Sequence, residues 1–162
     1  MDAGIHFSEL LAYNAEETNH WKRWFEAHPA AIDLACDVAG AGSVRKLLFH
    51  IFATELFFAN HALGLPRPDF EKLASSTTLD ELFAISEEAH NKFHSFLAKA
   101  TPEDWSQRRP LGFGDRQATP RKMLTQAVLH GVHHRGQLAT FLRQQGFKQD
   151  WIHDFILSEV MD

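Results

Sequence analysis

Four long segments with helical periodicity dominate this 162-residue sequence, and no series of residues alternates as β-strands do. Residues that commonly end helices follow three of these segments: Pro29 follows the first, Gly64 the second and Gly146 the last. The predicted helices cover residues 9–28, 43–63, 78–100 and 119–145. Four helices of about 20 residues, each about 30 Å long and joined by mostly short connections, predict an all-α four-helix bundle.

Shorter segments lie between and after these helices. Residues 30–38 are expected to form a short helical piece, and Thr101-Pro102 opens another short helix. Residues 108–117 contain one proline and two glycines, so a loop is predicted there. The tail over residues 150–160 is apolar enough to dock on the bundle or on a partner chain. The length indicates a single domain over residues 1–162, since a domain averages about 150 residues.

Composition excludes several classes of protein. Lys and Arg number 16 against 21 Asp and Glu, and the resulting net charge of −5 argues against nucleic acid and anionic membranes as partners. The single cysteine, Cys36, excludes an intrachain disulfide framework and a cysteine-rich zinc site. Neither a run of about 18 apolar residues nor a basic, then apolar, N-terminal leader is present. We therefore expect a cytoplasmic protein.

The 11 histidines are the candidates for chemistry, and two of them stand one helical turn apart. His130 and His134 are separated by about 40° around the last long helix, on the arc that faces the bundle. Two imidazoles at this spacing can bind one divalent ion without bending the helix. The alternative is a pair of hydrogen-bonded core histidines, but the inner position between Gly131 and Gly136 favours metal binding. His133 points about 100° away from His134 and is not expected to join them.

A third ligand is expected from a neighbouring helix, and His50 is the best candidate. It lies in the apolar stretch 47–52, where desolvation of an imidazole costs free energy unless a partner compensates. A metal ion would be such a partner, and a buried hydrogen bond is the alternative. His90 and His94 form a second pair, but they lie on the flank of their helix's apolar arc, where a solvated edge is expected.

Two charged residues occupy apolar arcs. Glu55 lies on the inner arc of the second long helix and Arg135 on that of the last. Buried charges are normally paired, so either an ion pair between them or contacts with the metal ligands is expected; the alternative is that both reach the surface.

A di-iron carboxylate site is a further hypothesis, because Glu-x-x-His occurs at Glu17 and at Glu87. That site needs a carboxylate from every helix, and residues 119–149 contain no Asp or Glu. The di-iron hypothesis is therefore rejected.

The segment over residues 130–137, His-x-x-His-His-Arg-Gly-Gln, resembles the signature of the last helix in the DinB/YfiT-like superfamily of metal-dependent proteins. Residues 44–51, followed by Glu55, are similar to the leucine-rich His-Ile motif of that family, and residues 10–14 are similar to its first helix. The resemblance extends from about residue 8 to residue 146.

The resemblance implies a four-helix bundle in which three histidines hold a divalent metal ion, usually zinc or nickel. Carried over to this sequence, the ligands are His50, His130 and His134. It also implies a homodimer, and some relatives are S-transferases or isomerases that use a low-molecular-weight thiol such as bacillithiol, mycothiol or glutathione.

Three neutral histidines leave coordination positions open, which is typical of a catalytic metal site. The leading hypothesis is an enzyme in which the ion deprotonates a small thiol, and the thiolate attacks an electrophilic small molecule. Glu55 or Arg135 would orient ligands or substrate, and Cys36, in a different segment, is not the nucleophile. A hydrolase that activates water at the same ligands is one alternative. A bundle that binds metal for stability or sensing, without catalysis, is the other.

Overall fold

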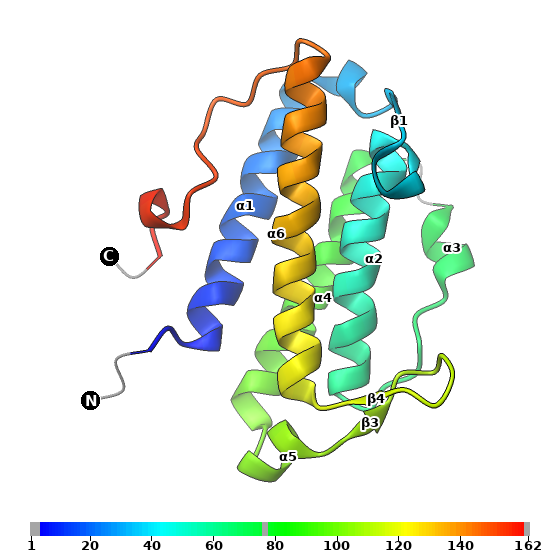
Figure 1. The fold of residues 1–162 in the computed structure, drawn as a ribbon, viewed down its shortest axis with the longest axis vertical. Coiled ribbons are helices and arrows are strands. Elements are labelled where there is room, and N and C mark those ends of the chain that lie inside the picture. Colours follow the sequence, from blue (N-terminus) through cyan, green and yellow to red (C-terminus); the bar gives the residue numbers. More distant parts are fainter. Residues whose placement is uncertain (1–3, 76–77, 161–162) are drawn as a thin grey trace.

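A computed structural model describes residues 4–75 and 78–160, and four long helices form a bundle (Figure 1). Helices α4 and α6 both pack on α2, while α1 packs on α4 and α6. The predicted all-α four-helix bundle is confirmed. The long helices are α1 (Phe7–Ala27), α2 (Val44–Ala62), α4 (Leu79–Lys99) and α6 (Pro120–Gln144).

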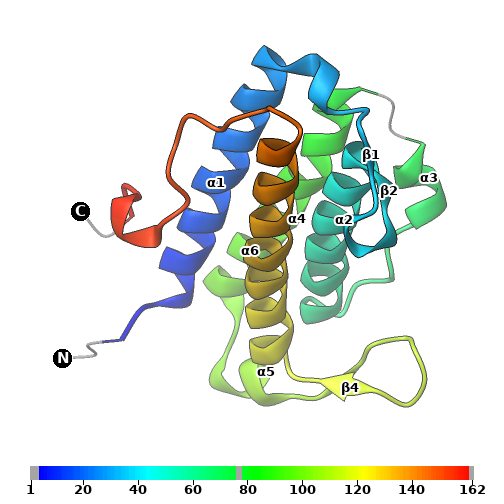
Figure 2. The same ribbon diagram turned by 45° about the horizontal axis from the view of Figure 1, so that its top comes forward.

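Helices α1 and α6 run in one direction through the bundle, and α2 and α4 run in the other (Figures 1 and 2). Because α2 and α4 are parallel, the chain after α2 runs back along the bundle through residues 63–75 (Figure 1). This part of the chain contains a short helix that was not predicted, α3 (Phe70–Ala74). The Asp69 side chain caps α3 by accepting a hydrogen bond from the Lys72 backbone N–H at 3.0 Å.

Capping residues stand at the ends of the long helices. Ser43, Thr78 and Thr119 are the N-caps of α2, α4 and α6, and each side chain accepts a backbone N–H from the first turn. Gly64 and Gly146 follow the ends of α2 and α6 with φ of +70° and +86°, a conformation that glycine adopts without a steric cost. The caps therefore explain why the predicted boundaries lie within a few residues of the observed ones.

The prediction of a short helix over residues 30–38 is wrong. The chain instead forms two 3₁₀ turns, Pro29–Ala31 and Val38–Gly40, and pairs strand β1 (Ala35–Cys36) with strand β2 (Gly42–Ser43). Gly40 and Gly42 have φ of +70° and +85°, so they reverse the chain and bring the two strands together. A single isolated helical turn gains too few hydrogen bonds to compete with this pairing.

The segment after α4 follows the prediction more closely. Helix α5 (Pro102–Ser106) begins after Thr101 as expected. Residues 108–117 form a loop, but its ends pair as strands β3 (Arg109–Pro110) and β4 (Gln117–Ala118), so the loop is a hairpin. The hairpin lies beside the end of α2 and the start of α6 (Figure 1).

Aromatic rings fill the bundle interior, and the largest fully buried side chains include Trp21, Phe25, Phe52 and Phe93. Helix α2 is buried over most of its surface. Its less buried side chains include exposed Lys46 and His50 and half-buried Phe49. His50 lies on the side of α2 that faces α6, with its Nε2 close to that of His130.

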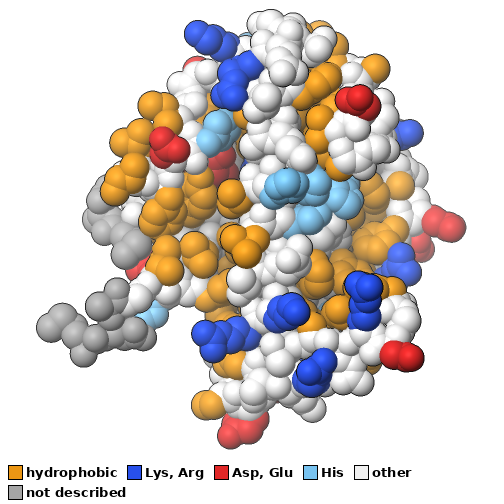
Figure 3. Space-filling view, viewed as in Figure 1, with side chains coloured by type: hydrophobic (Ala, Val, Ile, Leu, Met, Phe, Trp, Pro, Cys, Tyr) orange, Lys and Arg blue, Asp and Glu red, His pale blue; other side chains and the backbone are white. Residues whose placement is uncertain are grey.

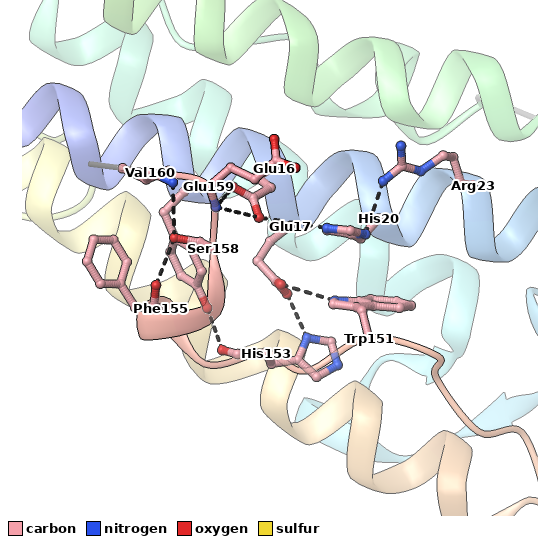
Figure 4. Close-up of polar contacts among 11 residues, drawn as sticks. Glu16, Glu17, His20, Arg23, Trp151, His153, Phe155, Ser158, Glu159 and Val160 are labelled. Carbon is pink, nitrogen blue, oxygen red and sulfur yellow. Dashed lines mark hydrogen bonds and ion pairs between the residues drawn. The ribbon is translucent and has the colours of Figure 1, made fainter. Parts of the chain in front are cut away.

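The tail after α6 docks on the bundle of its own chain, the first of the two expected alternatives (Figure 1). The Trp24 indole donates to the Lys148 carbonyl at 3.1 Å. The Trp151 indole and the His153 ring Nδ1 contact the two carboxylate oxygens of buried Glu17 at 3.1 and 2.7 Å (Figure 4). Glu17, considered above as part of a di-iron motif, therefore binds the tail.

None of the helices within residues 4–75 and 78–160 combines the length and apolar character that crossing a lipid bilayer requires.

Candidate metal centre

The three histidines predicted as ligands lie together on the seam between α2 and α6. His50 comes from α2, and His130 and His134 come from successive turns of α6. One nitrogen of each ring lies within 4.8 Å of a nitrogen of the others, and the Nε2 atoms of His50 and His130 are 3.1 Å apart. In the described part of the chain, no other group of three His, Cys, Asp or Glu side chains is arranged in this way. A single divalent ion fits this donor set.

The cluster is open on one side. His134 is buried at 8% exposure, His130 is half-buried, and His50 is exposed. Figure 3 shows the histidines as a continuous pale blue patch on the molecular surface. His50 lies in an apolar stretch of the sequence, but its position on α2 directs its side chain to the seam with α6, where it is exposed to solvent. An ion held here would be reached by small molecules from the His50 side.

The protonation of the rings suits metal binding. Burial lowers the pKa of His130 to about 3, with further lowering by neighbouring His134 and His50. Burial also lowers the pKa of His134, and of His50, which has His134 as an additional cause. All three rings are therefore neutral near pH 7, and neutral imidazole is the form that binds metals.

Gln137 orients His134, and the sequence analysis did not single it out. Its amide oxygen lies 2.7 Å from His134 Nδ1 and accepts the hydrogen of that nitrogen. Nε2 of His134 then carries no hydrogen, so its lone pair is free for a metal ion. The residue stands at the end of the motif over residues 130–137, and its spacing of three from His134 on one helix was the signal that could have found it.

Glu55 and Arg135 form the expected ion pair, with Glu55 Oε1 3.1 Å from an Arg135 terminal nitrogen. Glu55 is 0% and Arg135 4% exposed, so the alternative that both reach the surface is wrong. Asn14 of α1 and Ser86 of α4 also hydrogen-bond Glu55, so this network joins all four long helices.

The network is not hydrogen-bonded to the metal cluster in the described part of the chain. Within the described residues, neither Glu55 nor Arg135 hydrogen-bonds to any of the three histidines. Helix geometry explains this, because Glu55 is about 140° from His50 around α2 and Arg135 is about 100° from His134 around α6. No direct hydrogen bond in the described residues therefore links Glu55 or Arg135 to the metal ligands, and their role in orienting ligands or substrate stays a prediction.

Gly131 makes room for the network. A Cβ atom there would lie 2.9 Å from the Arg135 guanidinium, 3.1 Å from Asn14 Oδ1 and 3.2 Å from Glu55 Oε1. Gly136, by contrast, faces open space. Of these two glycines, only Gly131 serves a close approach, and the groups that approach it are the side chains of Arg135, Asn14 and Glu55.

His90 and His94 do not form a metal site. His94 is exposed, as expected, but His90 is half-buried, with Nε2 2.8 Å from Asn14 Nδ2. The amide donates to this nitrogen, since Asn14 Oδ1 already accepts from Arg135. His90 is therefore an outer member of the buried network.

A pocket of about 570 Å³ adjoins the metal cluster. His50 and His130 form one side of it, and Arg67 and the hairpin line another. Figure 3 shows hydrophobic side chains beside and below the histidine patch. Five phenylalanines line the pocket, namely Phe49, Phe57, Phe58, Phe70 and Phe113. Phe113 belongs to the loop over residues 108–117, so this loop forms part of the candidate site.

Cys36 lies apart from this chemistry, in strand β1. Its side chain is buried at 3% exposure, and burial raises the pKa of its thiol. The protonated thiol is a weak nucleophile, which agrees with the expectation that Cys36 does not react.

The sequence matches the protein-family model described as DinB family over residues 2–159. No curated protein matches the sequence.

Proposed function

Since the chain belongs to the DinB family, we propose that it is an enzyme in which His50, His130 and His134 hold one divalent metal ion, zinc or nickel. The proposed reaction transfers a low-molecular-weight thiol to an electrophilic small molecule. The observation that carries the proposal is the meeting of three neutral imidazoles at the edge of an open, mainly apolar pocket. A bound divalent ion would lower the pKa of a thiol, so that the reactive thiolate forms at neutral pH.

The chain's own residues support a catalytic site over a structural one. Structural zinc sites are closed by four protein ligands, whereas three protein ligands leave a position for a substrate. Here the three nitrogens come from two helices only, and exposed His50 leaves the outer side accessible. Gln137 holds the deepest ligand, His134, in a fixed ring orientation and tautomer.

The first test is elemental analysis of untagged protein purified without added metal. We expect near one zinc or nickel per wild-type chain, and most of it lost in His50→Ala, His130→Ala and His134→Ala. The matched control is His94→Ala, which removes an exposed histidine from α4, outside the cluster. Full metal content in all three cluster variants would disprove the assigned site.

The second test is turnover. Glutathione, bacillithiol and mycothiol are each offered with 1-chloro-2,4-dinitrobenzene, and thioether formation is followed by absorbance. We expect turnover with at least one thiol, and its loss in His134→Ala and after chelation. Metal binding with ester hydrolysis but no thiol transfer would favour a hydrolase. Metal binding without either reaction would favour a stabilising or sensing role.

A further inference from the structure

The walls of the pocket beside the histidines are aromatic on three separate segments. Helix α2 contributes three of the phenylalanines, α3 contributes Phe70 and the hairpin contributes Phe113. Phe57 is at the centre, with ring centroids 5.2 Å from Phe58, 6.3 Å from Phe70 and 6.0 Å from Phe113. Rings at these separations pack in the tilted and edge-on arrangements that aromatic groups prefer. A flat ring of a ligand is the natural partner for such walls.

The size of the pocket indicates a small molecule. Pockets of about 300–1,000 Å³ hold cofactors and drug-sized ligands, and this pocket measures about 570 Å³. Phe113 is 46% exposed although it is a large apolar side chain, so a ligand in the pocket would cover it.

Arg67 supplies the pocket with a positive charge at its solvent-exposed rim. Its guanidinium carbon lies 4.9 Å from the centre of the Phe70 ring, which holds the group at the pocket wall. No carboxylate in the described residues pairs with it, and no Asp or Glu lines the pocket. In a chain of net charge −5, an arginine without a counterion in an apolar pocket selects for an anion. Its planar set of donors matches an acidic group with two oxygens.

We infer that the electrophilic substrate is an aromatic small molecule that carries an acidic group. Its ring would lie against the phenylalanine walls and cover exposed Phe113, and its acidic group would pair with Arg67. His50 and His130 line the same pocket, so a substrate held in this way lies beside the metal ligands. The inference rests on the proposed function for the reaction, but not for the binding, which involves only the pocket.

Calorimetric titration of the purified full chain tests the inference with two matched probes. 2-Naphthalenesulfonate carries the ring and the negative charge and is a poor metal ligand, whereas 2-naphthalenemethanol carries the ring alone. We expect the sulfonate to bind about three- to tenfold more tightly, as for one partly exposed charged hydrogen bond. Arg67→Gln should abolish this preference, and Phe113→Ala should weaken both probes severalfold.

The control variant is Arg143→Gln, which removes an exposed arginine from the opposite end of α6 and should leave both affinities unchanged. Equal binding of the two probes, a preference that survives Arg67→Gln, or unchanged binding in Phe113→Ala would each overturn the inference.

Metal content of every sample separates this inference from the proposed function. Histidine-dependent metal without a probe preference would overturn the inference and leave the proposed function standing. A preference that depends on Arg67 in protein without metal would support the inference, while the proposed function would fail.

Discussion

Replacing Glu55 by glutamine tests whether the buried network stabilises the bundle as its geometry indicates. Glu55 Oε1 accepts hydrogen bonds from Arg135 and Asn14, both at 3.1 Å, and Oε2 accepts from the Ser86 hydroxyl at 2.8 Å. Glu55→Gln keeps the shape and the Oε1 acceptor, and its new NH₂ can donate to the Ser86 oxygen. The main loss is the negative charge that compensates Arg135.

The expected cost follows from burial. Arg135 is only 4% exposed, and removing one partner of a buried ion pair typically costs about 3–5 kcal/mol. Because the neutral hydrogen bonds survive in Glu55→Gln, we expect the lower end, about 3 kcal/mol. That is a large fraction of a total stability of about 5–15 kcal/mol.

Urea unfolding at pH 7 measures this loss. With an m-value of about 2 kcal/mol per molar urea, the midpoint should fall by about 1.5 M. Glu88→Gln is the control, since Glu88 pairs with Lys92 on the surface at 2.5 Å and is half exposed, so its change should be within about 0.5 kcal/mol. The double variant Glu55→Leu with Arg135→Met should recover only part of the stability, because no charge is left unpaired but buried Asn14 and Ser86 lose hydrogen-bond partners.

A midpoint for Glu55→Gln that matches the Glu88→Gln control would refute the reasoning about burial. Metal content should remain at the wild-type level, because the network makes no hydrogen bond to the three histidines in the described residues. Loss of metal in a folded Glu55→Gln protein would support the prediction that Glu55 orients the ligands.

The remaining predictions concern the ligand support, the network edge, the tail and the assembly. Gln137→Ala should weaken metal binding about 10- to 100-fold in a competition assay, whereas Gln137→Glu, which keeps the acceptor, should not. Burial lowers the pKa of His90, so the folded protein protonates His90 at a lower pH than the unfolded chain does, and stability falls as the pH drops below about 6.5. Between pH 7.5 and pH 5.5, the free energy of unfolding should therefore fall less in His90→Gln than in the wild type. An equal fall in both proteins would contradict this effect of burial at His90. Glu17→Gln weakens the contacts of Trp151 and His153, so limited proteolysis within residues 147–160 should become severalfold faster, and unchanged cleavage would show that Glu17 does not hold the tail. Light scattering should give the mass of a homodimer, for which the exposed tail residues Ile156 and neighbouring Leu157 offer an apolar surface; a monomer would remove this prediction.

The long helices were predictable because their signals are local. Ser43, Thr78 and Thr119 cap helices within a few residues of their own positions, and the apolar periodicity depends only on neighbours along the chain. The meeting of His130 and His134 is likewise a matter of one helical turn. Pairing them with His50 relied on desolvation and on the family resemblance, and the structure brings all three together.

The features that were missed depend on contacts between distant segments. The strand pair before α2 needs Gly40 and Gly42 to reverse the chain, which periodicity does not report. The pocket exists only because α3 and the hairpin both fold back on α2, bringing Phe70 and Phe113 to Phe57. The exposure of His50 also follows from where α6 lies against α2, not from the apolar residues that flank it in sequence.

The histidines stand on two long helices, while the pocket draws part of its wall from the tip of a short hairpin. Helix positions are held by the whole core, but a hairpin tip can exchange side chains, or lengthen, with little effect on the rest of the fold. Mutations at Phe113 and its neighbours can therefore change which molecules enter while the three ligands keep their places. Substrate selectivity can thus change without a change in the metal ligands, and residues 111–116 are the first targets for directed evolution of this protein.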